Sequence, residues 1–94
     1  MIKINRVQVL EDFKLKVWFS DGTHGVLDCA PIVAEDGPMV EPLRDPTYFA
    51  RVFLDYGAPT WPNSYDMAPW TVQKELADAG LLEPAPRQGK NAAE

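Results

Sequence analysis

The sequence predicts a single α+β domain, with a three- or four-stranded antiparallel sheet and two or three short helices. Apolar and polar residues alternate with period two in three segments of the first 30 residues, which is typical of half-buried strands. Helix signals come mostly after these strands, and this order favours α+β over an alternating parallel architecture. The length of 94 residues fits one domain.

The first predicted strand covers residues 2–9. Its apolar positions change phase by one residue near Asn5–Arg6, which indicates a β-bulge. Residues 10–12 form a short connection to the next strand. This first strand should therefore be irregular at its start.

The second predicted strand, residues 13–20, alternates cleanly and places Trp18 on the face opposite its apolar residues. Asp21-Gly22 follows and predicts a two-residue type I′ turn, in which both central residues have positive φ. The chain then returns over residues 24–29. These strands should form an antiparallel meander with one apolar face.

The second half contains shorter elements between prolines. Asp45 and Pro46 suit the N-cap and first position of a helix, and Gly80 suits a helix end. The elements expected here are helical turns at 32–34 and 39–43, a helix at 47–52, a strand at 53–56, a short strand at 60–61 and a helix at 69–79. We expect residues 1–82 to form the domain and residues 83–94 to form a flexible C-terminal tail, because the tail has little apolar content.

The net charge is −5 and the pI about 4.7, which argues against direct binding of nucleic acid. Residues 21–50 hold six Asp and Glu against one Arg, and they include Glu35, Asp36 and Glu41. Two interpretations stay open for this acidic third: an ordinary solvated surface, or a patch that meets a basic partner.

The composition favours a cytoplasmic protein without a cofactor. Cys29 is the only cysteine, and no apolar run reaches the roughly 18–20 residues that span a bilayer. The start of the chain does not resemble a signal peptide, so neither secretion nor membrane insertion is expected. His24 is the only histidine, and no ligand spacing supports a metal site.

Catalysis is not expected either. His24 and Asp28 would share one face of a strand, but positions four apart in a strand are about 13 Å apart, which is too far for a hydrogen bond. Cys29 would lie on the face opposite His24, and the glycines at 22 and 25 belong to a hairpin and not to a phosphate-binding loop.

Four stretches resemble a small bacterial family, domain of unknown function 2442. They are Leu15–Gly22, Val26–Asp28, Pro42–Phe49, and Trp61–Asn63 with Asp66–Pro69, which is similar to the family's "WpnGaDlaP" segment. Ser64 stands where the family usually has Gly, so it is strained if that position has positive φ; Trp70 stands where a polar residue is usual. The resemblance implies a small α+β domain without an established activity. Members are often encoded beside small toxin-like proteins, which implies an antitoxin or accessory binding role.

The segment from Trp61 to Asp66 allows two interpretations. In the first, Trp61 plugs the sheet edge, while Asn63 and Asp66 fasten the turn and cap the final helix. In the second, these residues form a recognition edge together with Tyr65.

The other two tryptophans are also ambiguous. Trp18 is either a core residue beneath helices that cover the second face of the sheet, or part of a surface for a protein partner or a homodimer. Trp70, in the first turn of the last helix, is a candidate contact residue.

We therefore expect a small non-enzymatic protein-binding domain, antitoxin-like or an accessory regulatory partner of a small basic protein. The alternative is a stand-alone structural domain that dimerises or senses a small ligand. The candidate partner-binding residues are Trp18, Glu35, Asp36, Glu41, Trp61, Asn63, Tyr65, Asp66 and Trp70.

Overall fold

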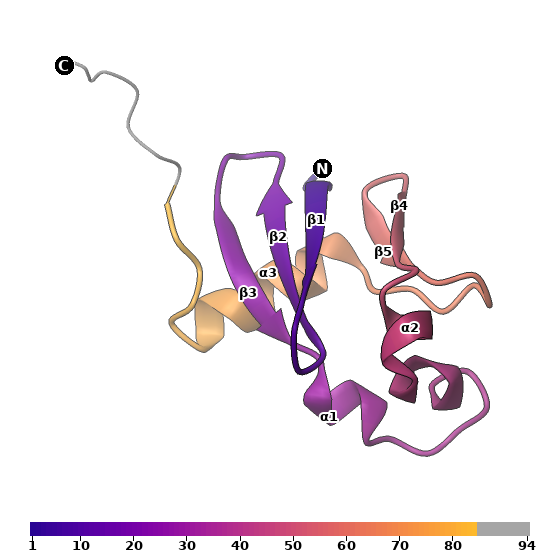
Figure 1. The fold of residues 1–94 in the computed structure, drawn as a ribbon. Helices are drawn as coiled ribbons and strands as arrows, with labels where there is room; N and C mark the ends of the chain where they lie inside the picture. The colour runs from indigo at the N-terminus through magenta and orange to yellow at the C-terminus, as the bar shows by residue number, and fades with distance from the viewer. Residues whose placement is uncertain (85–94) are drawn as a thin grey trace, which may run out of the picture.

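The computed structural model describes residues 1–84, which form the α+β fold that the sequence predicts. A three-stranded antiparallel sheet in the order β1-β2-β3 stands beside a separate two-stranded ribbon (Figure 1). The strands are β1 (Ile4–Leu10), β2 (Lys14–Phe19), β3 (His24–Asp28), β4 (Phe53–Asp55) and β5 (Ala58–Thr60). The predicted flexible tail lies, from residue 85 onward, outside the described residues.

The bulge predicted in the first strand is confirmed. Ile4 is opposite Phe19 and Arg6 is opposite Trp18, so β1 contains one extra residue between these pairs. Phe13 was expected inside the second strand, but it stands in the turn before it with φ of 60°. From there its ring packs edge-on against Phe49, with centroids 5.3 Å apart.

The turn between β2 and β3 differs from the predicted type I′ turn. Gly22 has a positive φ of 91°, whereas Asp21 does not, and Phe19 N–H bonds to the carbonyl of Thr23 around a three-residue loop. The Asp21 carboxylate accepts hydrogen bonds from the Thr23 amide, at 3.0 Å, and from its hydroxyl, at 2.6 Å. This local bonding offers the backbone an alternative to left-handed geometry at Asp21.

Within residues 1–84, four short helices follow the sheet: α1 (Ala30–Val33), η1 (Glu41–Arg44, a 3₁₀ helix), α2 (Pro46–Phe49) and α3 (Pro69–Asp78). The Asp45 carboxylate accepts a hydrogen bond from the Thr47 amide and so caps α2 as predicted. The expected cap of α3 by Asp66 is wrong, because Ala68 is the N-cap and no side chain bonds there. None of the helices in residues 1–84 has the length and apolar character needed to cross a membrane.

The ribbon corrects the prediction of two loosely placed strands. Asp55 pairs with Ala58, so Tyr56 and Gly57 form a two-residue turn. Their φ values are 51° and 80°, as a type I′ turn requires. The amide of Ile4 donates to the Gly57 carbonyl at 2.9 Å, which ties the ribbon tip to the start of β1.

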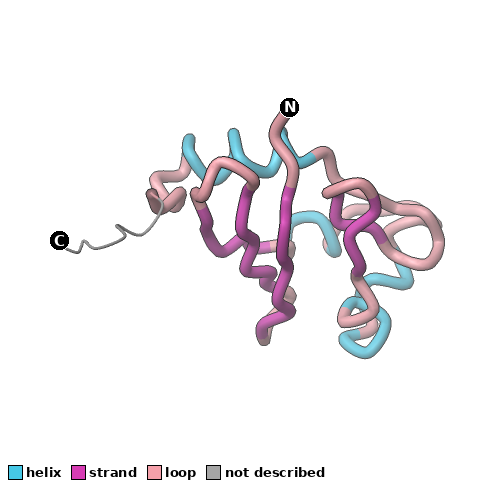
Figure 2. The backbone as a smooth tube through the Cα atoms, turned by 90° about the horizontal axis from the view of Figure 1, so that it is seen from above, coloured by secondary structure: helices cyan, strands magenta, loops and turns pink. Residues whose placement is uncertain are grey.

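One hydrophobic core lies between the sheet and the helices. Leu15 and Val17 of β2 pack there with Val72 and Leu76 of α3, which lies across one side of the sheet (Figure 2). The other side carries Trp18, and within the described chain no helix covers it. The expectation of a second helical layer over Trp18 is therefore wrong. Apart from α3, the helices within residues 1–84 have only four residues each.

Candidate partner-binding surfaces

Trp61 belongs to the core and not to a recognition edge. Its side chain is 1% exposed, and its indole N–H donates to the carbonyl of Phe49 at 2.9 Å. The ring lies 5.6 Å from that of Phe49 and 5.9 Å from that of Tyr65. The structural interpretation of the segment therefore holds for this residue, and Trp61 cannot contact a partner in the folded state.

Asn63 joins two acidic segments that are distant in sequence. Its Oδ1 accepts from the amide of Tyr65 at 3.1 Å, which closes the turn after Trp61. Its Nδ2 donates to the carbonyl of Met39 at 2.9 Å. Met39 lies in the loop that follows Glu35 and Asp36. The loop and the turn, which the sequence singled out separately, thus form one surface.

Tyr65 is a half-buried member of this surface, next in sequence to Asp66. Partial burial is the main cause that raises the pKa of its hydroxyl. The negative charges of Glu35, Cys29 and Asp66 raise this pKa further, in decreasing order. The charges that act on Tyr65 thus come from both the acidic loop and the turn after Trp61. We call Glu35, Asp36, Glu41 and Asp66, with Tyr65 and Met39, the acidic surface.

Within residues 1–84, no salt bridge pairs a cation with a carboxylate of the acidic surface. Arg44 lies beside the acidic loop, but its guanidinium donates to the backbone carbonyls of Val33, at 2.7 Å, and of Glu35. Among residues 1–84 the only salt bridge joins Lys74 to Asp78, on the exposed side of α3. The four carboxylates of the acidic surface are exposed and available to a basic partner.

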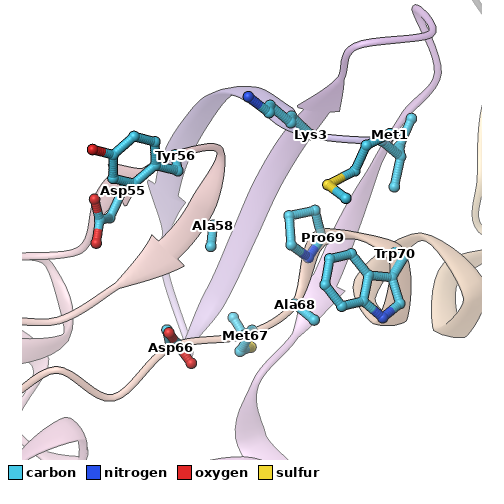
Figure 3. Close-up of a pocket in the computed structure, with 11 residues that line it drawn as sticks. Met1, Lys3, Asp55, Tyr56, Ala58, Asp66, Met67, Ala68, Pro69 and Trp70 are labelled. Carbon is cyan, nitrogen blue, oxygen red and sulfur yellow. The ribbon is translucent and has the colours of Figure 1, made fainter.

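A groove of about 310 Å³ lies next to the acidic surface, between the first residues, the ribbon tip and the segment leading into α3 (Figure 3). Tyr56 and Trp70 line it, with 89% and 56% of their side chains exposed. Asp66 belongs both to this lining and to the acidic surface. Tyr56 was not among the candidate contact residues predicted from the sequence, because the expected strand at 53–56 included it. Its Tyr-Gly step could have indicated a turn that presents the ring to solvent.

Trp18 lies apart from these residues, on the outer face of the sheet. The Arg6 guanidinium is 4.5 Å and the Lys16 ammonium 5.1 Å from its ring centroid. Of the predicted contact residues, the structure therefore groups Glu35, Asp36, Glu41, Asn63, Tyr65 and Asp66, with Trp70 across the groove. Trp18 and Trp61 stand outside this group.

The groups that could support catalysis are kept apart. Cys29 is buried, and burial raises the pKa of its thiol to about 12, assisted by the negative charges of Asp28 and Glu75. His24 lies on the outer face of the sheet, away from this thiol. Within residues 1–84, no three His, Cys, Asp or Glu side chains are grouped closely enough to hold a metal ion.

We expect Cys29 to resist thiol reagents in the folded protein, because the reactive thiolate is rare far below a pKa of about 12. Ellman's reagent at neutral pH should react slowly with the native chain and rapidly in urea. Equal rates in both states would show that the thiol is accessible and ionised in the fold.

Comparison with known proteins gives one match. A family model described as "Protein of unknown function (DUF2442)" matches residues 4–85, which confirms the resemblance seen in the sequence. The curated proteins and the solved structures contain no match. The description assigns no activity, so an argument about function rests on the surfaces described above.

Proposed function

The chain belongs to the DUF2442 family, and from this premise we propose that it acts by binding another protein, without chemistry of its own. The partner is a small basic protein, and the role is that of an antitoxin-like or accessory regulatory partner in the cytoplasm. The acidic surface is the contact region, and the groove with Tyr56 and Trp70 supplies apolar anchors beside it.

The observation that supports this proposal is the bond between Asn63 and Met39, which joins the two segments that carry the exposed acidic residues. The two segments hold each other through a backbone carbonyl, so their carboxylates are presented together rather than on independent loops. A preformed surface of this kind loses less conformational entropy on binding than two mobile loops.

Aromatic side chains at the edge of the acidic surface favour a protein partner. Tyr and Trp are enriched among residues that dominate binding energy, and Tyr56 and Trp70 both lie exposed at one groove. Tyr56 also holds a left-handed backbone conformation that is unfavourable for an aromatic residue. Such strain is concentrated at functional sites, which supports a role in contact.

A second candidate function is a domain that senses a small ligand or dimerises. The same groove supports it, because its volume of about 310 Å³ is at the lower end of the range for ligand pockets. Sedimentation velocity over a range of concentrations, without any partner, would reveal dimerisation.

We expect the triple variant Glu35→Lys, Asp36→Lys, Glu41→Lys to bind its partner at least tenfold more weakly at low salt. Exposed ion pairs are each worth about 0.2–1 kcal/mol, and reversal also adds repulsion. The partner is first captured from the native host at low salt, identified by mass spectrometry and purified. Its affinity for both proteins is then measured by calorimetry at several salt concentrations.

The matched control is Glu11→Lys, Glu75→Lys, Asp78→Lys, which makes the same change in net charge at exposed residues elsewhere. The control should retain affinity to within about twofold, since it removes no proposed contact. If the first triple variant binds with unchanged affinity and salt dependence, the acidic surface is not the contact region. Failure to recover any partner would count against protein binding itself.

A further inference from the structure

Within residues 1–84, no helix covers the outer face of the three-stranded sheet. Its residues face away from the core and from α3, which lies on the opposite side (Figure 2). Cross-strand pairing places the following side chains on this face: Arg6, Gln8, Leu10, Lys14, Lys16, Trp18, His24, Val26 and Asp28. We call this set the outer sheet face.

The outer sheet face is positive in a protein whose net charge is −5. Arg6 and Lys16 both lie within about 5 Å of the Trp18 ring, and Lys14 follows on the same strand. None of the three cations has a carboxylate within salt-bridge distance in residues 1–84. Asp28, opposite Lys14 at the end of β3, is the one acidic residue of the set.

A hollow of about 240 Å³ opens on this face at the edge of β3. Lys16, His24 and Val26 line it from the sheet, and Leu81 and Glu83 line it from the chain after α3. His24 and Glu83 exchange backbone hydrogen bonds of 3.1 and 2.7 Å, so this wall is fixed to the strand. The hollow therefore combines apolar walls with the cation of Lys16 and the carboxylate of Glu83.

We propose that the outer sheet face binds an acidic, extended segment of a protein partner. Carboxylates of the segment pair with Arg6 and Lys16, whose own charges have no partner in the described chain. An apolar side chain of the segment enters the hollow between Val26 and Leu81. The surface and the sign of its charge both differ from those of the acidic surface, so this proposal does not depend on the proposed function.

Two features favour an acidic segment over a nucleic acid. A base would stack on the Trp18 ring, but Arg6 and Lys16 already lie against that ring. A nucleic acid also extends its negative charge beyond the patch, over a protein that is negative overall, whereas a short segment confines its carboxylates to the cations.

A second copy of the chain suits the outer sheet face less well than an acidic segment does. Its acidic surface would have to dock on the outer sheet face of its neighbour, a head-to-tail contact between different surfaces. Contacts of that kind generate rings or open-ended filaments rather than a closed pair.

The test measures the fluorescence anisotropy of three labelled probes at low and high salt. The probes are a short peptide of alternating Glu and Leu, the matching peptide of Lys and Leu, and a thymidine oligonucleotide. The Glu-Leu peptide should bind in a salt-dependent way, and Arg6→Glu and Lys16→Glu should each weaken binding about tenfold. Lys74→Glu, the same charge change at an exposed lysine of α3, should have little effect.

Circular dichroism and urea unfolding of each variant establish that it is folded, and Lys16→Gln gives a milder change at the same position. The proposal is overturned if the Glu-Leu peptide does not bind, or binds equally well to Arg6→Glu and Lys16→Glu. Tighter binding of the oligonucleotide would assign the face to nucleic acid. Self-association in sedimentation velocity that Lys16→Glu abolishes would assign it to a second copy. The variants leave Glu35, Asp36 and Glu41 intact, so these outcomes are separate from those of the proposed function.

Discussion

Replacement of Trp61 by alanine should destabilise the domain by about 4 kcal/mol, within the range of 3–5 kcal/mol for large aromatic residues in cores. The side chain is 1% exposed and packs between Phe49 and Tyr65, so its removal leaves a cavity. The carbonyl of Phe49 also loses its indole donor in a buried environment. Since small domains are stable by only about 5–15 kcal/mol, urea denaturation should show a large loss of stability or an unfolded chain.

Two variants separate the causes of this loss. Trp70→Ala removes the same side chain from the groove, where it is 56% exposed, and should cost less than about 1 kcal/mol. Trp61→Phe keeps most of the ring but removes the hydrogen bond to the Phe49 carbonyl. Its loss of stability should therefore lie between the losses of Trp61→Ala and Trp70→Ala. If Trp61→Ala and Trp70→Ala have equal effects on stability, Trp61 is not the core residue that we describe.

The sequence predicted the meander because its signal is local and repeated. Alternation over β1 and β2 identified the buried faces, and the change of phase near Asn5 identified the bulge that separates Ile4 from Arg6 in the pairing. Two of the predictions that failed concern single residues whose side chains can bond in more than one way. Asp21 bonds to Thr23 instead of adopting positive φ, and Asp66 faces the acidic surface instead of capping α3.

The candidate site was only partly predictable for a similar reason. Charge density identified residues 35–41, and turn and aromatic residues identified 61–66, but their contact depends on the bond from Asn63 to Met39 across 24 positions. Nothing in either segment alone specifies that bond. The conformation of Ser64, in contrast, could be anticipated from the sequence. The family resemblance places a glycine at this position, and Ser64 has the left-handed φ of 72° that a glycine there suggests.

The position of the groove depends on how the ribbon tip meets β1, and Gly57 controls that contact. Gly57→Ala should destabilise the domain by about 2–3 kcal/mol. The left-handed φ of 80° contributes about 1–2 kcal/mol, and the remainder comes from steric overlap. A Cβ atom there would lie 2.6 Å from Cβ and 2.9 Å from Cγ of Lys3, positions too close to the backbone to move freely. Urea denaturation measures the total loss.

Gly80→Ala is the matched control, because Gly80 has a similar φ of 73° but no heavy atom within 4 Å of the added Cβ. It should therefore show the conformational part alone, and the difference between the two variants measures the contact with Lys3. In Gly57→Ala the Ile4 amide should also exchange its hydrogen faster, because it loses a well-placed acceptor at the Gly57 carbonyl. Equal losses in the two variants, with unchanged exchange at Ile4, would mean that the ribbon is not anchored to β1. The groove would then be an adaptable surface, and Tyr56 could not serve as a fixed anchor for a partner.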